Sequence, residues 1–133
     1  MNPEIKARWI AALRSGEYVQ GTCLLRASRL DGVDRFCCLG VLCDLAAQSG
    51  VVSWAMDGDY ALESEGGQVQ HLNEVLPYPV MKWAGLDSTN PVVRSELLDR
   101  TEANPYGATE LAELNDRHGH SFLQLADCIE VSL

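Results

Sequence analysis

The chain has 133 residues, of which 47% are hydrophobic and 22% are charged, and these proportions are typical of a folded domain. Ten basic residues against 19 acidic residues give a net charge of −9, which disfavours direct binding to the phosphate backbone of a nucleic acid. No apolar run reaches the roughly 18 residues that a membrane-spanning helix needs. The length fits one domain, which we expect to span residues 1–133.

The cysteines bear on the compartment and on metal binding. There are five of them, an odd number that cannot all pair within one chain. The first residues lack a basic segment followed by an apolar stretch, so no secretory leader is indicated. We therefore expect a cytoplasmic protein with free thiols. Because the paired Cys-x2-Cys spacing of structural zinc sites is missing, we predict no metal site, and we expect no cofactor.

The first element expected is an N-terminal helix. Asn2 is a favourable N-cap, Pro3 suits the first helical position, and Gly16 ends the helix. Apolar residues at helical spacing predict its buried face: Ile5, Trp9, Ala12 and Leu13.

A β-hairpin is expected next. Residues 22–26 form a strand-like run, and Asp31 with Gly32 gives a strong turn signal before Phe36. The hairpin is the most basic part of the chain, since it contains Arg26, Arg29 and Arg35.

Residues 37–49 form the most apolar run, and Gly50 follows as a helix-ending residue. A helix that is apolar nearly all round is buried, so we predict that this one is the central helix of the fold. The helical periodicity places Cys37 on the polar side with Asp44 and Gln48. It places the following residues on the core face: Cys38, Leu42, Leu45 and Ala46.

In residues 51–72 the pattern predicts strands and turns, including a second hairpin. Further helices are predicted over 80–84, over 109–116 and after Ser121. Ser121 and Gln124 match a capping box. We therefore predict an α+β fold in which N-terminal and C-terminal helices pack on the central helix, with one or two short antiparallel hairpins. The pattern leaves open whether three aromatic residues cover the core or form an exposed patch: Trp54, Tyr78 and Trp83.

One candidate site is a thiol at a helix N-terminus, where the helix dipole lowers a thiol pKa. Cys38 begins the central helix and His71 lies on a predicted strand. Residues 38–41, Cys-Leu-Gly-Val, resemble the nucleophile segment of NlpC-type, papain-like cysteine peptidases. That resemblance implies that Cys38 is the nucleophile and His71 the general base of a hydrolase. The sequence departs from the family at Cys37, where the family usually has Asp.

A second candidate is an anion pocket for a small phosphorylated ligand. Arg26 and Arg35 of the hairpin could face the N-terminus of the central helix near Cys37. His118 and His120 lie in the turn between the last two helices, where we expect them at the surface without a metal. The last helix carries Asp127 and Glu130 and no basic residue, so we do not expect it to read DNA.

Several segments together resemble small proteins of unknown activity from actinobacterial phages and their hosts: residues 8–18, 36–45, 80–86, 114–116, 121–122 and 126–127. The resemblance implies a phage or prophage accessory protein in the host bacterial cytoplasm. It brings no catalytic residues. The favoured hypothesis is a non-catalytic protein that binds and inhibits a host protein or sequesters a small ligand. The alternative is the cysteine hydrolase that uses Cys38 and His71.

Overall fold

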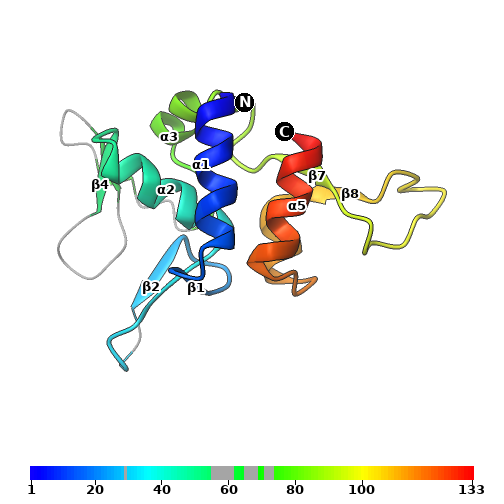
Figure 1. Cartoon of the computed structure of the whole chain (residues 1–133), viewed down its shortest axis with the longest axis horizontal. Coiled ribbons are helices and arrows are strands. Elements are labelled where there is room, and N and C mark those ends of the chain that lie inside the picture. The colour runs from blue at the N-terminus through cyan, green and yellow to red at the C-terminus, as the bar shows by residue number, and fades with distance from the viewer. Residues whose placement is uncertain (29, 55–61, 65–68, 71–73) are drawn as a thin grey trace.

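The computed structural model describes residues 1–28, 30–54, 62–64, 69–70 and 74–133. At its centre, helix α1 (Pro3–Arg14) lies beside helix α5 (Phe122–Ser132), as Figure 1 shows. Arg14 bridges the two helices through ion pairs with Asp127 at 2.7 Å and Glu130 at 2.9 Å. The two ends of the sequence therefore meet in the middle of the fold.

Helix α1 begins as its sequence predicts. The side chain of Asn2 accepts hydrogen bonds from the backbone N–H groups of Glu4 and Ile5, and Pro3 occupies the first turn. Its buried residues are Ile5, Trp9, Ile10 and Leu13. Ile10 takes part in place of the predicted Ala12, which is half-buried, because α5 covers the flank of α1 on which Ile10 lies.

A three-stranded sheet follows, in the order β1 (Val19–Gln20), β3 (Asp34–Phe36), β2 (Arg26–Ser28). The antiparallel β2–β3 pair confirms the predicted hairpin. The parallel β1–β3 pair was not expected, since parallel pairing leaves no local turn signal in a sequence. The strand begins at Arg26 rather than at residue 22. Before it, the N–H of Leu24 donates to the carbonyl of Thr22 at 2.8 Å around Cys23, whose φ is +68°.

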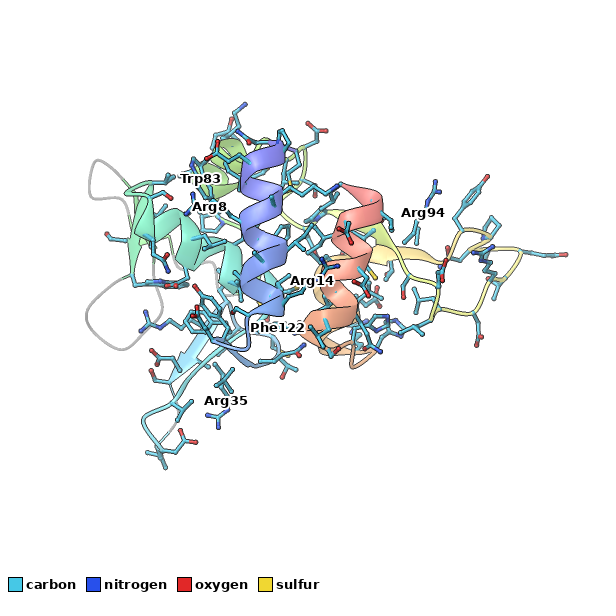
Figure 2. All side chains as sticks on the ribbon, in the orientation of Figure 1. Arg8, Arg14, Arg35, Trp83, Arg94 and Phe122 are labelled. Atoms are coloured by element: carbon cyan, nitrogen blue, oxygen red, sulfur yellow. The ribbon has the colours of Figure 1, made fainter. Side chains whose placement is uncertain are left out.

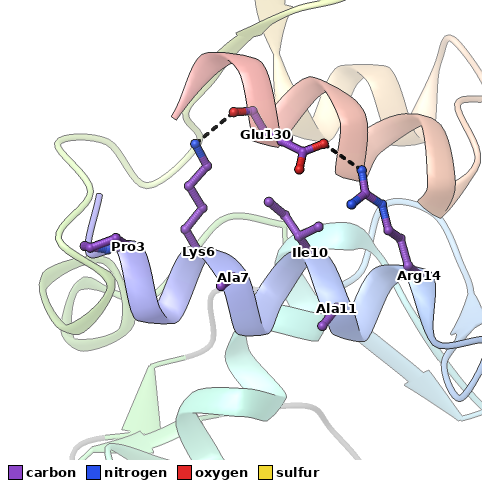
Figure 3. Close-up of a pocket in the computed structure, with 7 residues that line it drawn as sticks. All are labelled: Pro3, Lys6, Ala7, Ile10, Ala11, Arg14 and Glu130. Atoms are coloured by element: carbon purple, nitrogen blue, oxygen red, sulfur yellow. Dashed lines mark hydrogen bonds and ion pairs between the residues drawn. The ribbon is translucent and has the colours of Figure 1, made fainter.

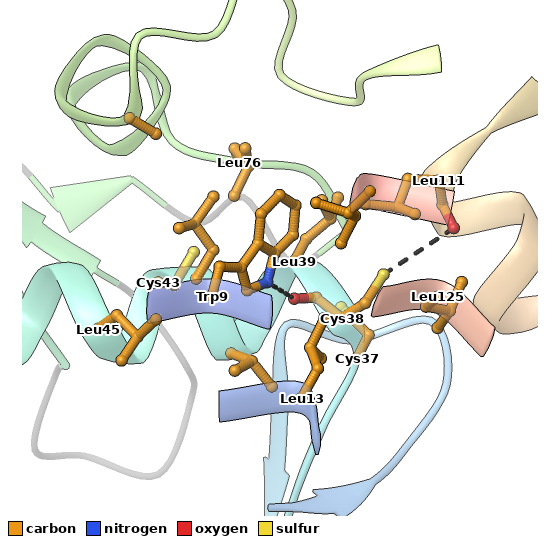
Figure 4. Packing of buried hydrophobic residues seen from close by; sticks show 14 of the residues in the cluster. Trp9, Leu13, Cys37, Cys38, Leu39, Cys43, Leu45, Leu76, Leu111 and Leu125 are labelled. Atoms are coloured by element: carbon orange, nitrogen blue, oxygen red, sulfur yellow. Dashed lines mark hydrogen bonds between the residues drawn. The ribbon is translucent and has the colours of Figure 1, made fainter. Parts of the chain in front are cut away.

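Helix α2 (Cys38–Gln48) is the buried central helix, as predicted. It packs against α1 and against α3 (Tyr78–Ala84) and α4 (Leu111–Asp116). Trp9 of α1 donates through Nε1 to the carbonyl of Cys38 at 3.0 Å, deep in the core that Figure 4 shows. Gly40 makes room for the preceding loop, because a Cβ there would lie 1.6 Å from the carbonyl oxygen of Leu25.

The placement of Cys37 on a polar side is wrong. Its side chain is only 1% exposed, and its Sγ accepts a hydrogen bond from the N–H of Gly40 at 3.4 Å. Cys37 is the N-cap of α2 and therefore lies outside the helical repeat. The periodicity that places Asp44 and Gln48 away from the core does not apply to it.

Strands β4 (Val52–Trp54), β5 (Leu62–Ser64) and β6 (Val69–Gln70) form a small antiparallel sheet, which agrees with the expected second hairpin. Helix α3 ends at Gly85, which has a φ of +66°. Among the described residues, no helix has the length and apolar character needed to cross a membrane.

The last third of the chain adds a hairpin of β7 (Val92–Arg94) and β8 (Ala108–Glu110), followed by α4 and α5. The predicted helix over 109–116 starts at Leu111, because the residues before it pair with β7. The capping box of Ser121 and Gln124 is confirmed. The loop over 95–107, hereafter the hairpin loop, extends away from the helices in Figure 1. The α+β class is thus confirmed, and the terminal helices α1 and α5 also pack against each other, a contact that the sequence did not predict.

Candidate functional site

Cys38, the nucleophile of the alternative hypothesis, lies in the core. Its side chain is 0% exposed, and its Sγ lies 3.9 Å from the carbonyl oxygen of Leu111 (Figure 4). Burial raises the pKa of the thiol well above its ordinary value, which is the opposite of what a nucleophilic cysteine needs. His71 lies outside the described residues. The described geometry gives a cysteine hydrolase no support.

The residues of the predicted anion pocket have partners within the chain. Arg26 forms an ion pair with Asp34 at 2.5 Å, and Arg35 forms one with Asp31 at 2.9 Å. The guanidinium group of Arg26 also lies over the ring of Trp54, at 5.2 Å from its centroid. Burial raises the pKa of the Cys37 thiol to about 12. An anion at this place stays a prediction, and it would have to compete with two carboxylates.

The three aromatic residues left open by the sequence do not form one patch. Trp54 and Trp83 are partly buried and pack against the core, whereas Tyr78 is 59% exposed. Trp54 donates through Nε1 to Asp44 at 2.9 Å, and the guanidinium group of Arg8 lies 6.0 Å from the centroid of the Trp83 ring (Figure 2). Trp54 and Trp83 therefore contribute to the packing of the core.

A shallow pocket of about 370 Å³ lies along α1 and α5 (Figure 3). Two cationic side chains of α1 cross it: Lys6 donates to the carbonyl of Glu130 at 2.9 Å, and Arg14 pairs with its carboxylate. These contacts join the two helices, so we regard the pocket as part of their packing.

A cleft of two adjoining cavities lies between the hairpin loop and α5. The first measures about 390 Å³ and is lined by Arg94, Ser95, Glu96, Leu97, Gln124, Asp127, Cys128 and Val131. The second measures about 310 Å³ and is lined by Arg94, Ser95, Glu96, Arg100, Tyr106 and Val131. The α5 residues follow the i, i+3, i+4, i+7 spacing of one helical face. The cavities share four residues, so we treat them as one cleft.

Ser95 is held firmly at the base of this cleft. Its backbone N–H donates to the carbonyl of Gly107 at 2.9 Å, which closes the hairpin loop. Gly107 has a φ of +58°, and a Cβ there would lie 2.8 Å from the carbonyl oxygen of Ser95. The Ser95 Oγ accepts from the N–H of Leu97 at 3.2 Å. The hydroxyl position is therefore fixed by backbone contacts.

The Ser95 hydroxyl pairs with a buried histidine. Its Oγ lies 2.7 Å from Nε2 of His120, whose side chain is 4% exposed. Burial lowers the pKa of His120, and a backbone hydrogen bond with His118 opposes that shift. The expectation of two surface histidines is thus wrong for His120, which turns inward at the start of α5, and right for His118.

The second cavity carries unpaired positive charge. Arg94 lies over the ring of Tyr106 at 5.3 Å, and neither Arg94 nor Arg100 has a carboxylate within ion-pair distance in the described chain. Four other described arginines do form ion pairs: Arg14, Arg26, Arg35 and Arg117. With Glu96 as its one acidic lining residue, this cavity is net positive in a chain whose net charge is −9.

The described residues contain no group of three or more His, Cys, Asp or Glu side chains placed to hold a metal ion. The cleft instead combines two guanidinium groups, an aromatic ring and a serine hydroxyl within hydrogen-bond distance of an imidazole, and its acidic lining residues are Glu96 and Asp127, of which Asp127 is paired with Arg14. Such a set can bind an anionic group, and the serine–histidine pair has the arrangement of a nucleophile and its base.

A family model described as a domain of unknown function, DUF8296, matches residues 1–133. The chain belongs to the DUF8296 family. The match covers the whole chain, in keeping with the resemblance to a family without an assigned activity. Neither a curated protein nor a solved structure matches the chain.

The sequence did not single out the cleft of this DUF8296 domain. Ser95 and His120 lie 25 positions apart in segments without a recognisable motif. Nothing in the sequence around Arg94 and Arg100 distinguishes them from other arginines at a protein surface. The one available signal was a histidine next to Gly119 in a tight turn between two helices, which permits the side chain to turn inward.

Proposed function

We propose that this DUF8296 domain is a phage or prophage accessory protein that works by binding. Its ligand or host partner would dock in the cleft between the hairpin loop and α5 through an anionic group. The observation that carries the proposal is that Arg94 and Arg100 line one cavity and have no carboxylate partner in the described chain.

Charge complementarity supports an anionic occupant. Guanidinium groups bind carboxylate and phosphate groups through two parallel hydrogen bonds. Four described arginines form such ion pairs, whereas the two in the cleft do not, nor does Arg8 on α1, which lies over the ring of Trp83.

Exposed apolar side chains surround the same cleft. Leu97 is 62% exposed, Tyr106 65% and Val131 76%. Exposing apolar surface of this size to water is unfavourable in free energy. An interface commonly combines such an apolar area with a few charged groups that fix orientation. The cleft therefore supports a binding role better than the pocket between α1 and α5, whose charges are used internally.

The test uses a photocrosslinking amino acid in place of Val131, with exposed Tyr78 on α3 as the control position. Protein expressed in an actinobacterial host is irradiated and its products are identified by mass spectrometry. We expect a discrete adduct at position 131 that is lost in an R94Q/R100Q variant and retained in R117Q, which removes one surface charge elsewhere. Equal adducts at positions 78 and 131, or an adduct unaffected by R94Q/R100Q, would contradict the proposal.

A further inference from the structure

We infer that Ser95 is a nucleophile activated by His120, and that the cleft hydrolyses a small ester that carries a negative charge. The serine–histidine pair stands on its own geometry, whereas the preference for an anionic ester rests on the proposed binding function of Arg94 and Arg100.

The geometry of the pair is that of a nucleophile and a general base. The Ser95 Oγ lies 2.7 Å from Nε2 of His120, within the range over which a proton passes directly between two groups. Ser95 is 4% exposed and lines both cavities of the cleft. The N–H of Leu97, which donates to Oγ at 3.2 Å, holds the hydroxyl at the base of the cleft.

His120 is kept in the form that a base requires. Its burial disfavours the charged imidazolium, so its pKa lies below the ordinary value of 6.5. The backbone of His118 partly opposes that shift in pKa, and a ring that carries its proton on Nδ1 leaves Nε2 free to accept from Ser95. The titratable group that acts on the ring is His118, whose ring centroid lies 6.4 Å away.

The reaction balances with water as the only co-reactant. The Ser95 Oγ forms a bond to the ester carbonyl carbon as its proton passes to Nε2 of His120. The carbon–oxygen bond to the leaving alcohol breaks, and that alcohol takes the proton from His120. Water then attacks the acyl-serine and gives a proton to His120. The carboxylic acid leaves as the proton returns to the Ser95 Oγ.

The two cavities indicate the kind of ester. The first offers apolar surface from Leu97, Cys128 and Val131 beside Ser95, which suits a short acyl chain. The second offers Arg94 and Arg100, which suit a carboxylate or phosphate at the other end of the molecule. Cavities of about 390 and 310 Å³ fall at the small end of ligand sites, so the substrate is a small molecule.

The first experiment treats the folded, full-length chain with a neutral alkyl fluorophosphonate, whose phosphorus the Ser95 Oγ attacks with release of fluoride. Mass spectrometry locates the adduct. We expect one adduct on Ser95, absent in S95A and unchanged in S88A, which alters an exposed serine outside the cleft. No adduct on the wild-type chain, or an adduct on another serine, would overturn the inference. Site mapping on the wild-type chain decides the matter even if S95A fails to fold.

The second experiment separates a base from a structural partner. His120→Gln keeps a polar side chain near Ser95 but removes the imidazole, so the labelling rate should fall about 100-fold or more. The wild-type rate should also fall as the pH is lowered through the His120 pKa, below 6.5. A rate that shows neither the pH dependence nor the loss in H120Q means that His120 only supports the loop.

The third experiment tests the substrate class. We compare hydrolysis of p-nitrophenyl hydrogen succinate with hydrolysis of neutral p-nitrophenyl acetate. The wild-type chain should favour the anionic ester, and R94Q/R100Q should reduce that preference about tenfold or more. Labelling of Ser95 without any preference for the anionic ester would overturn the role of the arginines while leaving the serine–histidine pair in place. If Ser95 is not labelled but R94Q/R100Q still weakens binding of an anion, the binding proposal stands and the proposed ester hydrolysis is overturned.

Discussion

The N-terminus of α2 and the cleft beside α5 both collect polar groups, but those around Asn115 at α2 are paired within the chain, whereas two guanidinium groups of the cleft have no carboxylate partner in the described residues. At α2, the buried Asn115 donates to the carbonyl of Gly21 at 2.9 Å and accepts from the N–H of Cys38 at 3.3 Å. In the cleft, Arg94 and Arg100 face a cavity without a carboxylate partner in the described chain. The difference separates polar groups that hold the fold from polar groups that are available to a ligand.

The cysteines illustrate the same contrast. Cys37 and Cys38 stand at a helix N-terminus, the usual setting for a reactive thiol, yet burial raises the pKa of both. The hydroxyl of Ser95 has no such position in the sequence and its side chain is only 4% exposed, yet it lines a cavity and lies within hydrogen-bond distance of the imidazole of His120. A neighbouring base and an adjoining cavity, more than position at a helix terminus, distinguish Ser95 from the two cysteines.

The largest effect is expected where the α2 region is most crowded. Gly40→Ala would put a methyl group 1.6 Å from the carbonyl oxygen of Leu25, so loop and helix must separate. We expect a loss of about 3 kcal/mol or more in the free energy of unfolding, measured by urea denaturation. Gly16→Ala is the control, because its Cβ would meet nothing within 4 Å and its φ of +75° costs only about 1–2 kcal/mol. Similar losses for both variants would contradict the close packing at Gly40.

The next largest effect concerns the buried amide. Asn115→Ala removes the partner of the Cys38 N–H, the Gly21 carbonyl and the Gln20 side chain, which donates to Asn115 at 3.0 Å. We expect a loss of about 2–3 kcal/mol, since buried groups left unpaired cost their desolvation free energy. Thermal and urea unfolding measure it. A variant as stable as the wild-type chain would show that water replaces the amide.

A smaller effect links the cleft to pH. The pKa of His120 is lowered in the folded chain, so below 6.5 the unfolded chain binds the proton more readily than the folded chain does. Its contribution to stability is therefore full above pH 6.5 and is lost as the pH falls through the folded pKa. Urea unfolding at pH 7.5 and 5.5 should show lower stability at pH 5.5, and the drop should shrink in H120Q. An equal loss of stability in the wild-type chain and in H120Q would mean that titratable groups other than His120 cause it.

The smallest effect on stability is expected for the groups offered to a ligand. The double variant R94Q/R100Q should unfold within about 0.5 kcal/mol of the wild-type chain, because neither guanidinium group has an ion pair to lose. The loss of the Arg94 contact with Tyr106 is the one expected cost. A loss above 1 kcal/mol would mean that the arginines support the hairpin loop rather than a ligand.

Local rules predicted most of the fold. The Asn2 cap, the Ser121 capping box and the apolar run of α2 each depend on residues close together in the sequence. The parallel β1–β3 pair and the start of α4 at Leu111 depend on partners far away in the chain. Short strands of this kind carry too few residues to show an alternating pattern.

The candidate site could not be predicted because it depends on burial and on long-range contacts. From the sequence His120 is expected at the surface, but in the structure the hairpin loop places Ser95 against it. From the sequence Cys38 is expected to be a reactive thiol, but in the structure Trp9 and Leu111 contact it in the core. The hydropathy pattern shows which residues prefer the interior, but not which polar residue another segment will cover.

The contact between α1 and α5 also bears on how the chain folds. Lys6 and the Glu130 carbonyl that it binds are 124 positions apart, so the helix pair forms only after a very long loop has closed. Folding rates fall as the average separation of contacting residues rises. We therefore expect α2 and its neighbours to fold early and the α1–α5 pair late, so that a weakened Arg14–Glu130 bridge speeds unfolding more than it slows folding.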